Sequence, residues 1–432
     1  NEGTDLGADV QLIASEVHTK VPSEVQMTGA FIVSQTNGSS QGGNVTVTAD
    51  RVTMEQGSGI FSGTEGEGAG GDLSIQGTKD AGGVAVSVTL SRGSMIAAST
   101  SGSGAGGGIS ITAQSLDLDV SSALNTSTNG NVPNGDIVVS VGNATLSNQS
   151  TFGSVTASSG EGAAGGEITV QGLKGEGSKA DSFILEGPGT GIKSGAFGLG
   201  SLGNIEVHAK TVSLMDGAVI EAGTSLSLAT AGDIVIDAND VSISGGSHIF
   251  SHAFALDAGT VTITADQFSL NQSSIETDTS SPTGGQGGAV VLNVGSASLT
   301  NGATINSSTS NTGRAGNITM NVGSLTLANH SIITNSSSGI EIEGGAGAAG
   351  NITIQSGSTV VMNNSSITTE AKQASGGQIT INAPEMVRLT DSRISTSVSD
   401  GTGGGGNIKI DPQFVILQNS QIIAQAFAGA GG

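Results

Sequence analysis

The sequence predicts an all-β protein: a right-handed parallel β-helix with three short strands per coil. A short pattern returns about fourteen times, at intervals of 27 to 37 residues, and apolar and polar residues alternate within it. The right hand follows from the general rule for parallel crossovers. One coil buries too few aliphatic side chains to offset the entropy of ordering its backbone, so the coils must stack. We therefore expect residues 1–432 to form a single β-helical repeat domain, a segment of a longer chain.

Each repeat opens with an anchor glycine, followed two and four positions later by apolar residues. After Gly316 these are Ile318 and Met320, with Thr319 between them. This period of two is typical of a strand with one buried face. We interpret the glycines as turn residues. Ala8 holds the anchor slot of the first repeat, and the anchor glycines are Gly43, Gly71, Gly107, Gly135, Gly166, Gly203, Gly232, Gly259, Gly288, Gly316, Gly350, Gly377 and Gly406.

Two further strands follow in each repeat. A second apolar pair comes nine or ten residues after most anchors, for example Leu325 and Leu327. A lone large apolar residue in a Ser/Thr-rich setting then predicts the third strand, and we assign this position to Ile305, Ile332 and Ile367 among others. The Ser, Thr, Asn and acidic side chains are expected on the outer surface.

The charge balance limits the classes of partner. The chain has 13 basic and 36 acidic residues, a net charge of −23, which makes nucleic acid or an anionic membrane an unsuitable partner. It contains no cysteine, which favours an exported protein, and it has no apolar run long enough to span a membrane. We expect no cofactor and no metal site.

An Asn or Asp follows the anchor in many repeats. A stacked row of these residues would offer a ligand site, but Asn and Asp also tolerate left-handed backbone and bond their own main chain. Identical side chains one coil apart can in addition form ladders. We interpret the row as a structural turn ladder, formed by Asn44, Asp72, Asp136, Asn204, Asp233, Asn317, Asn351 and Asn407.

The repeat is interrupted where residues are inserted. In the units anchored at Ala8, Gly71 and Gly166, the second strand comes seventeen residues after the anchor instead of nine, and the last two insertions both begin Gln-Gly-x-Lys. A separate enlargement spans residues 335–349. Insertions on a solenoid face are where partners bind, although they can also be tolerated surface loops. The candidate binding residues are Lys79, Lys174, Lys179, Glu341 and Glu343.

Catalytic and metal sites are not expected. His248 and His252 are four residues apart, so both point to one face of a strand, but no third ligand is evident and we expect solvated histidines. No cluster of carboxylates with a basic residue is apparent, so we predict no catalytic residues and no enzyme activity. The alternative is a β-helical polysaccharide-binding or polysaccharide-cleaving protein, a lyase, hydrolase or tail-spike type. Its sign would be a row of carboxylates or aromatics over three or more coils, and the chain has only ten Phe and no Trp or Tyr.

Residues 349–377 and 405–432 combine G-N-I-x-I, V-x-L and S-x-I at fixed offsets. In these motifs the chain resembles the repeats of filamentous-haemagglutinin-like exoproteins, which Gram-negative bacteria export by two-partner secretion. The resemblance implies a β-helical shaft outside the cell or on its surface, exported through an outer-membrane partner pore. The family's Asn-Pro-Asn-Gly motif is echoed only faintly at residues 131–135, which we interpret as an ordinary turn.

The expected function is therefore that of a structural and adhesive shaft of an exported bacterial surface or filament-forming protein. It would act as a rigid scaffold whose loops make the contacts. Further expected partners are a second copy of the chain in a filament, or a host, cell or polysaccharide surface.

Overall fold

A computed structural model describes residues 8–13, 23–78, 83–157, 164–196, 201–224, 229–254, 256–280, 284–310, 312–338, 347–399, 403–429 and 431. The chain forms two compact units, Asn1–Ala222 and Gly223–Gly432. All regular structure in the described residues is β-strand, and both units are parallel β-solenoids with three strands per coil. This confirms the predicted fold class.

In the first unit the first and second strands of each coil belong to one sheet and the third strands to another. The first strands are β1 (Val10–Ile13), β4 (Val45–Thr48), β7 (Leu73–Gln76) and β14 (Ile168–Gln171). The second strands are β2 (Glu24–Thr28), β5 (Arg51–Glu55), β8 (Ala85–Leu90) and β15 (Ala180–Glu186). Three coils join both into one long strand, β10 (Ile109–Leu118), β12 (Ile137–Ser147) and β17 (Ile205–Met215). The third strands are β3 (Phe31–Thr36), β6 (Gly59–Thr64), β9 (Met95–Thr100), β11 (Ala123–Thr128), β13 (Thr151–Thr156), β16 (Gly191–Ala196) and β18 (Val219–Gly223).

The second unit repeats this arrangement. Its first strands are β19 (Ile234–Asp237), β28 (Ile352–Ser356), β31 (Ile379–Asn382) and β34 (Ile408–Asp411). Its second strands are β20 (Asp240–Ser244), β29 (Thr359–Asn363), β32 (Met386–Thr390) and β35 (Phe414–Gln418). The long joined strands are β22 (Val261–Asn271), β24 (Val290–Thr300) and β26 (Ile318–Ala328). The third strands are β21 (His248–Ala253), β23 (Ser274–Thr279), β25 (Thr304–Thr309), β27 (Ile332–Ser337), β30 (Ser366–Ala371), β33 (Arg393–Val398) and β36 (Gln421–Ala426).

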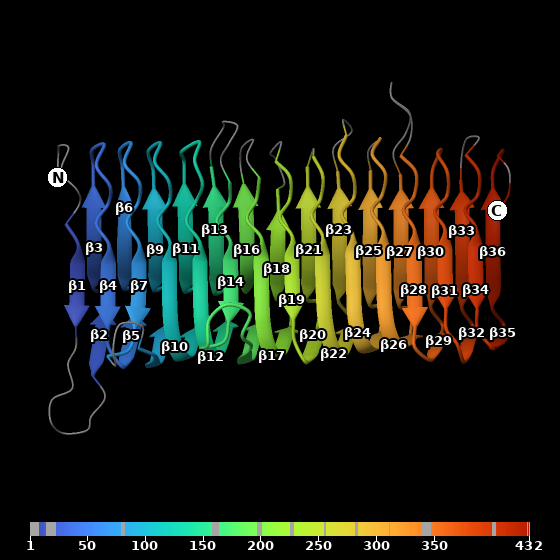
Figure 1. Cartoon of the computed structure of the whole chain (residues 1–432), viewed down its shortest axis with the longest axis horizontal. Helices are drawn as coiled ribbons and strands as arrows, with labels where there is room; N and C mark the ends of the chain where they lie inside the picture. The colour runs from blue at the N-terminus through green and yellow to red at the C-terminus, as the bar shows by residue number, and fades with distance from the viewer. Residues whose placement is uncertain are drawn as a thin grey trace. The chain divides into compact units, whose positions relative to one another are not determined.

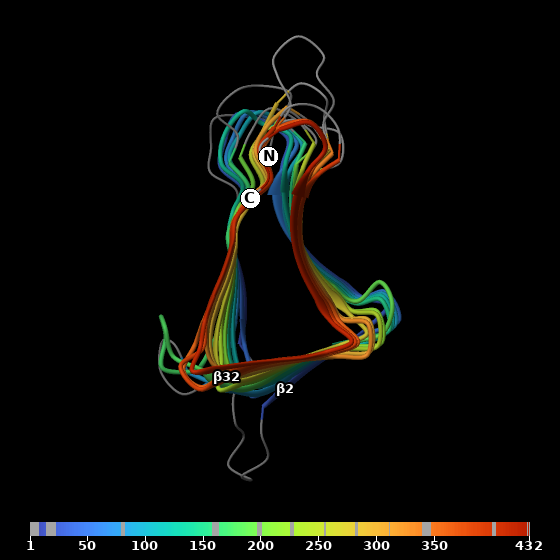
Figure 2. The same cartoon turned by 90° about the vertical axis from the view of Figure 1, so that its right-hand side faces the viewer.

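Strands of successive coils pair in parallel and in register, and Figure 1 shows them side by side within each unit. The three strands of a coil lie on three sides around a common interior, with second strands such as β32 along the base in Figure 2. The aliphatic residues that follow the anchors face this interior. Ile318, for example, pairs with Ile352, and both are fully buried. The predicted inward face of the first strand is therefore correct.

One assigned core position was wrong. The third-strand residue opposite Ile305 is Ile333, which is fully buried, whereas Ile332 pairs with Thr304 and is 37% exposed. Two adjacent isoleucines satisfy the local pattern in either register, so only pairing with the neighbouring coil distinguishes them.

The expectation that Ser and Thr lie outside fails on the third strands, where one polar row is buried. Ser62, Thr277 and Ser307 are almost completely inaccessible to solvent. Their hydroxyls donate to carbonyl oxygens of the anchor corner, for example Ser307 Oγ to Gly288 O at 2.7 Å and Ser62 Oγ to Gly43 O at 2.9 Å. Because buried hydroxyls need hydrogen-bond partners, these residues pair with carbonyls that no β ladder satisfies.

The anchor glycines are required by close approach rather than by turn conformation. The glycines with positive φ do not include them; left-handed residues occur instead between second and third strands, as at Asn301 and Gly302. A Cβ atom on Gly288 would overlap the carbonyl oxygen of Gly259, the anchor of the preceding coil. The corner thus brings successive backbones too close for any side chain, which is why the same glycine recurs.

Candidate functional site

Two of the inserted loops have the same construction. Each follows a first strand, and the amide N–H of its first glycine donates to a carbonyl six residues later: Gly77 to Gly83 O at 2.8 Å, and Gly172 to Ser178 O at 2.7 Å. A backbone hydrogen bond therefore closes the base of each insertion. Lys79 in the first loop, and Glu341 and Glu343 in the later enlargement, lie outside the described residues.

The second loop borders a pocket of about 380 Å³, which we call the lysine pocket. Here β14 and β15 are interrupted by the loop, whereas the flanking strands β12 and β17 run on without a break. The pocket is lined by Val141 and Gly142 of β12, by Leu173, Lys174, Ser178 and Lys179 of the loop, by Asp181 of β15 and by Lys210 of β17.

The pocket lining contains three lysines and one carboxylate. Lys210 Nζ lies 2.6 Å from Asp181 Oδ1, and both side chains are more than half exposed. Lys174 is exposed and Lys179 is half-buried. The structure thus brings the predicted Lys174 and Lys179 to one site, and it adds Lys210, which comes from the next coil. Lys210 was not among the predicted site residues, because nothing in the sequence of its strand distinguishes it. Only the register of β15 with β17, which places Lys210 beside Asp181, identifies it.

The base of the first loop is tied to the solenoid through Asp50. Thr78 Oγ1 donates to Asp50 Oδ1 at 2.7 Å, and the Ser23 amide donates to Asp50 Oδ2 at 3.2 Å. The hydrogen bond from the Thr78 hydroxyl is the largest influence, and it lowers the pKa of Asp50 below its usual value of 3.8. The ionised carboxylate therefore stabilises this corner.

This arrangement predicts a pH-dependent effect of Asp50→Asn. A lowered pKa means that the folded state holds its proton less tightly than the unfolded state, so the stabilisation is present above pH 3.8 and is lost as the pH falls below it. Asn also places an NH₂ group against the Ser23 amide or the Thr78 hydroxyl. We expect Asp50→Asn to lower the free energy of unfolding by about 1–2 kcal/mol at pH 7, and by clearly less at pH 3, in urea unfolding followed by circular dichroism. Equal losses at both pH values would contradict this account, and Asp216→Asn, in an exposed turn, is the matched control.

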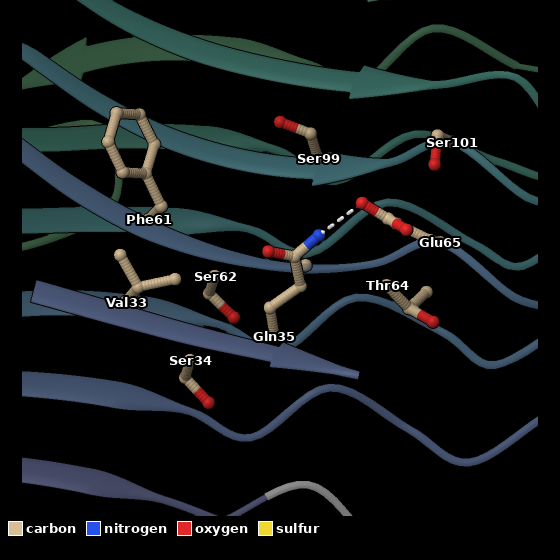
Figure 3. Close-up of a pocket in the computed structure, with 10 residues that line it drawn as sticks. Val33, Ser34, Gln35, Phe61, Ser62, Thr64, Glu65, Ser99 and Ser101 are labelled. Carbon is tan, nitrogen blue, oxygen red and sulfur yellow. Dashed lines mark hydrogen bonds between the residues drawn. The ribbon is translucent and has the colours of Figure 1, made fainter. Parts of the chain in front are cut away.

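A second pocket lies on the outer face of the third-strand sheet, with a volume of about 230 Å³ (Figure 3). Gly63 is one of its lining residues, and we call this cavity the pocket over Gly63. Val33 and Phe61 line one part, and Gln35 Nε2 donates to Glu65 Oε1 at 2.8 Å in another. Phe31 is 64% exposed and stacks on Phe61 with ring centroids 6.1 Å apart. The sequence predicted that aromatics are too scarce to form a row over three or more coils; the register of β3 and β6 brings two of them together.

The Asn and Asp row after the anchors forms rungs between coils. In at least six of the eight predicted residues the side-chain Oδ1 accepts the backbone N–H at the same position of the next coil, as in Asn44 Oδ1 with Asp72 N at 2.8 Å and Asn317 Oδ1 with Asn351 N at 2.9 Å. The other pairs of this kind begin at Asp72, Asp136, Asp233 and Asn351. The backbone carbonyls of Asn204 and Asn407 accept the amides of Ile168 and Ile379.

None of these residues adopts the left-handed backbone that we expected, because left-handed residues occupy a different corner. Their side chains bond the next coil instead of their own main chain. The row is mostly exposed, and burial together with the carboxylates of Glu206 and Asp136 raises the pKa of Glu167 beside it.

The two histidines lie on the outer face of β21 and contact hydrogen-bonding side chains of β23. His248 Nδ1 is 2.6 Å from Ser274 Oγ, and His252 Nδ1 is 2.9 Å from Asp278 Oδ1. The separation of Ser274 Oγ and His248 Nδ1 falls within the roughly 2.6–3.2 Å expected of a nucleophile and its base, whereas Ser280 Oγ lies 3.4 Å from His252 Nε2. No group of three His, Asp or Glu side chains within the described ranges is placed to hold a metal ion.

The fold and its sites define the class of the protein as a parallel β-solenoid with loops inserted at one corner. No family model, no curated protein and no solved structure matches the chain. Among the residues described, no helix is long and apolar enough to cross a membrane.

Proposed function

We propose that this chain is the structural and adhesive shaft of an exported bacterial surface or filament-forming protein. The observation that carries the proposal is the repetition of interlocked rows: aliphatic side chains, buried hydroxyls and Asn/Asp rungs join each coil to the next within each unit. Their hydrogen-bonding groups are used between coils, which suits a stiff scaffold. The inserted loops, with their closed bases, are the surfaces that we propose make contacts.

The finer assignment follows the resemblance to filamentous-haemagglutinin-like exoproteins. We propose export through an outer-membrane partner pore of a Gram-negative bacterium, and display outside the cell. The net charge of −23 supports this role, because self-repulsion keeps exported shafts soluble and apart. We also propose that the chain is not an enzyme. Serine–histidine contacts such as Ser274 Oγ with His248 Nδ1 and Ser280 Oγ with His252 Nε2 lie along the outer face of neighbouring third strands, where they join one coil to the next.

Immunogold electron microscopy of intact source cells tests the proposal. An antibody raised against this chain should label fibres outside the cell, and brief treatment of intact cells with external protease should remove the label. A cytoplasmic protein detected on the same grids is the control for intact envelopes. Labelling confined to the cell interior would overturn the proposal.

A second candidate function, binding of a neutral polysaccharide, is favoured by the pocket over Gly63. Stacked Phe31 and Phe61 present an apolar face of the kind that packs on the C–H face of a sugar ring. Gln35 and Glu65 lie beside it with groups that can bond sugar hydroxyls. The lining comes from β3, β6 and β9, hence from three coils.

A further inference from the structure

We infer that the lysine pocket binds a saccharide that carries carboxylate or sulfate groups. The inference rests on the proposal that inserted loops make the contacts of the shaft, and it names the chemistry that one such loop would bind. All residues that line the lysine pocket belong to the first unit.

Positive charge is concentrated at the lysine pocket. The chain has only 13 Lys and Arg among 432 residues, and three of them line this one pocket, with Asp181 as the single acidic residue in its lining. On a chain of net charge −23, an anionic ligand is repelled by most of the surface. A local excess of positive charge therefore determines where such a ligand can bind.

Shape and polarity indicate a sugar rather than a small inorganic anion. A volume of about 380 Å³ falls within the range of about 300–1,000 Å³ typical of organic ligand sites. Val141 and Leu173 contribute apolar lining, whereas the lysines contribute hydrogen-bond donors. A uronate or sulfated sugar ring matches this combination, because one face carries C–H groups and its edge carries hydroxyl and anionic groups.

The loop is held in shape before any ligand binds. Ser178 donates through both its amide and its hydroxyl to Gly175 O, at 3.0 and 2.6 Å. Gly175 and Gly177 have φ of 87° and 69°, a conformation that favours glycine. Because these contacts already order the loop, binding incurs little further entropic cost. Lys174 and Lys179 are therefore presented from a preformed loop, and Lys210 of β17 lines the same pocket.

The test measures binding of the whole chain by isothermal titration calorimetry. The probes are oligogalacturonate for carboxylates, dextran sulfate for sulfates and unmodified dextran as the neutral control. We expect one or both anionic probes to bind in low salt, and binding to be lost near 1 M salt, where the screening length falls to about 3 Å. Carboxylate-only or sulfate-only binding identifies the group recognised. Failure of both anionic probes, or equal binding of dextran, would overturn the inference.

Substitutions locate the site. Lys174→Gln, Lys179→Gln and Lys210→Gln should each weaken binding roughly two- to fivefold, the value of an exposed charge pair, and the triple variant should weaken it at least about tenfold. Lys193→Gln, on the third strand β16, removes the same charge elsewhere and should change affinity less than about twofold. An equal effect of Lys193→Gln would mean that net charge alone drives binding, and would reject the pocket.

Substitution of Asp181 is expected to tighten binding. It is paired with Lys210 at 2.6 Å, so Asp181→Asn should release that cation and tighten binding about twofold or more. Asp216→Asn, which removes one acidic charge from a turn outside the pocket, should have a smaller effect. Weaker binding of Asp181→Asn would contradict the assigned geometry.

The outcomes separate this inference from the proposed function. Fibres on the cell surface with no binding of either anionic probe would leave the shaft in place and reject the lysine pocket as a saccharide site. Binding that depends on the three lysines, in a chain found only inside cells, would support the lysine pocket as a saccharide site and reject the proposed exported shaft.

Discussion

A charge at position 352 is expected to cause a large loss of stability. Ile352 is fully buried on β28, in register with Ile318 before it and Ile379 after it. Ile352→Asp would remove these apolar contacts and place a carboxylate where no partner or water can reach it. We expect the free energy of unfolding to fall by about 4 kcal/mol or more, measured by urea unfolding, with new protease cleavage near residue 352.

Thr353→Asp is the matched control for this substitution. Thr353 is the next residue on β28, points away from the interior and pairs with Thr319 and Thr380. The same carboxylate on the outer face should cost no more than about 1 kcal/mol, the span of strand propensities. Similar losses for the two variants would show that the inward face has been assigned wrongly.

The second large effect is expected at the anchor corner, from Gly288→Ala. Its new Cβ would overlap the carbonyl oxygen of Gly259, and Gly288 O itself accepts hydrogen bonds from Thr277 and Ser307. The backbones can separate only by weakening these bonds and the adjoining β ladder. We expect a loss of about 3 kcal/mol, at the upper end of overpacking effects, measured by the shift of the urea midpoint at constant slope.

Gly357→Ala controls for the loss of a glycine. A Cβ there would approach Gly323 no closer than 3.4 Å, an ordinary van der Waals contact, and Gly357 does not have positive φ. Alanine should therefore be neutral or slightly stabilising, because it reduces the entropy of the unfolded chain. If Gly288→Ala proved equally harmless, close approach would not be the reason for the repeated glycine.

The local pattern predicted the strands and most of the core correctly. Alternation after each anchor placed Ile318 and Ile352 in the interior, and the extra residues after Gly71 and Gly166 located two closed loops. Such patterns are readable because a strand exposes its two faces with a period of two, and an insertion must leave the solenoid to preserve the stack. The error at Ile332 arose where two adjacent isoleucines made both faces acceptable.

The contacts between coils required the folded structure. Lys210 meets Asp181 although 29 positions separate them, Phe31 stacks on Phe61, and Gly288 excludes a side chain because Gly259 lies against it. The number of residues in each coil, the register of neighbouring strands and the side-chain rotamers together determine which residues become lateral neighbours. The alternation of apolar and polar residues within a single repeat determines none of these. Residue patterns therefore specified the coil, and the stacking of coils created both candidate sites.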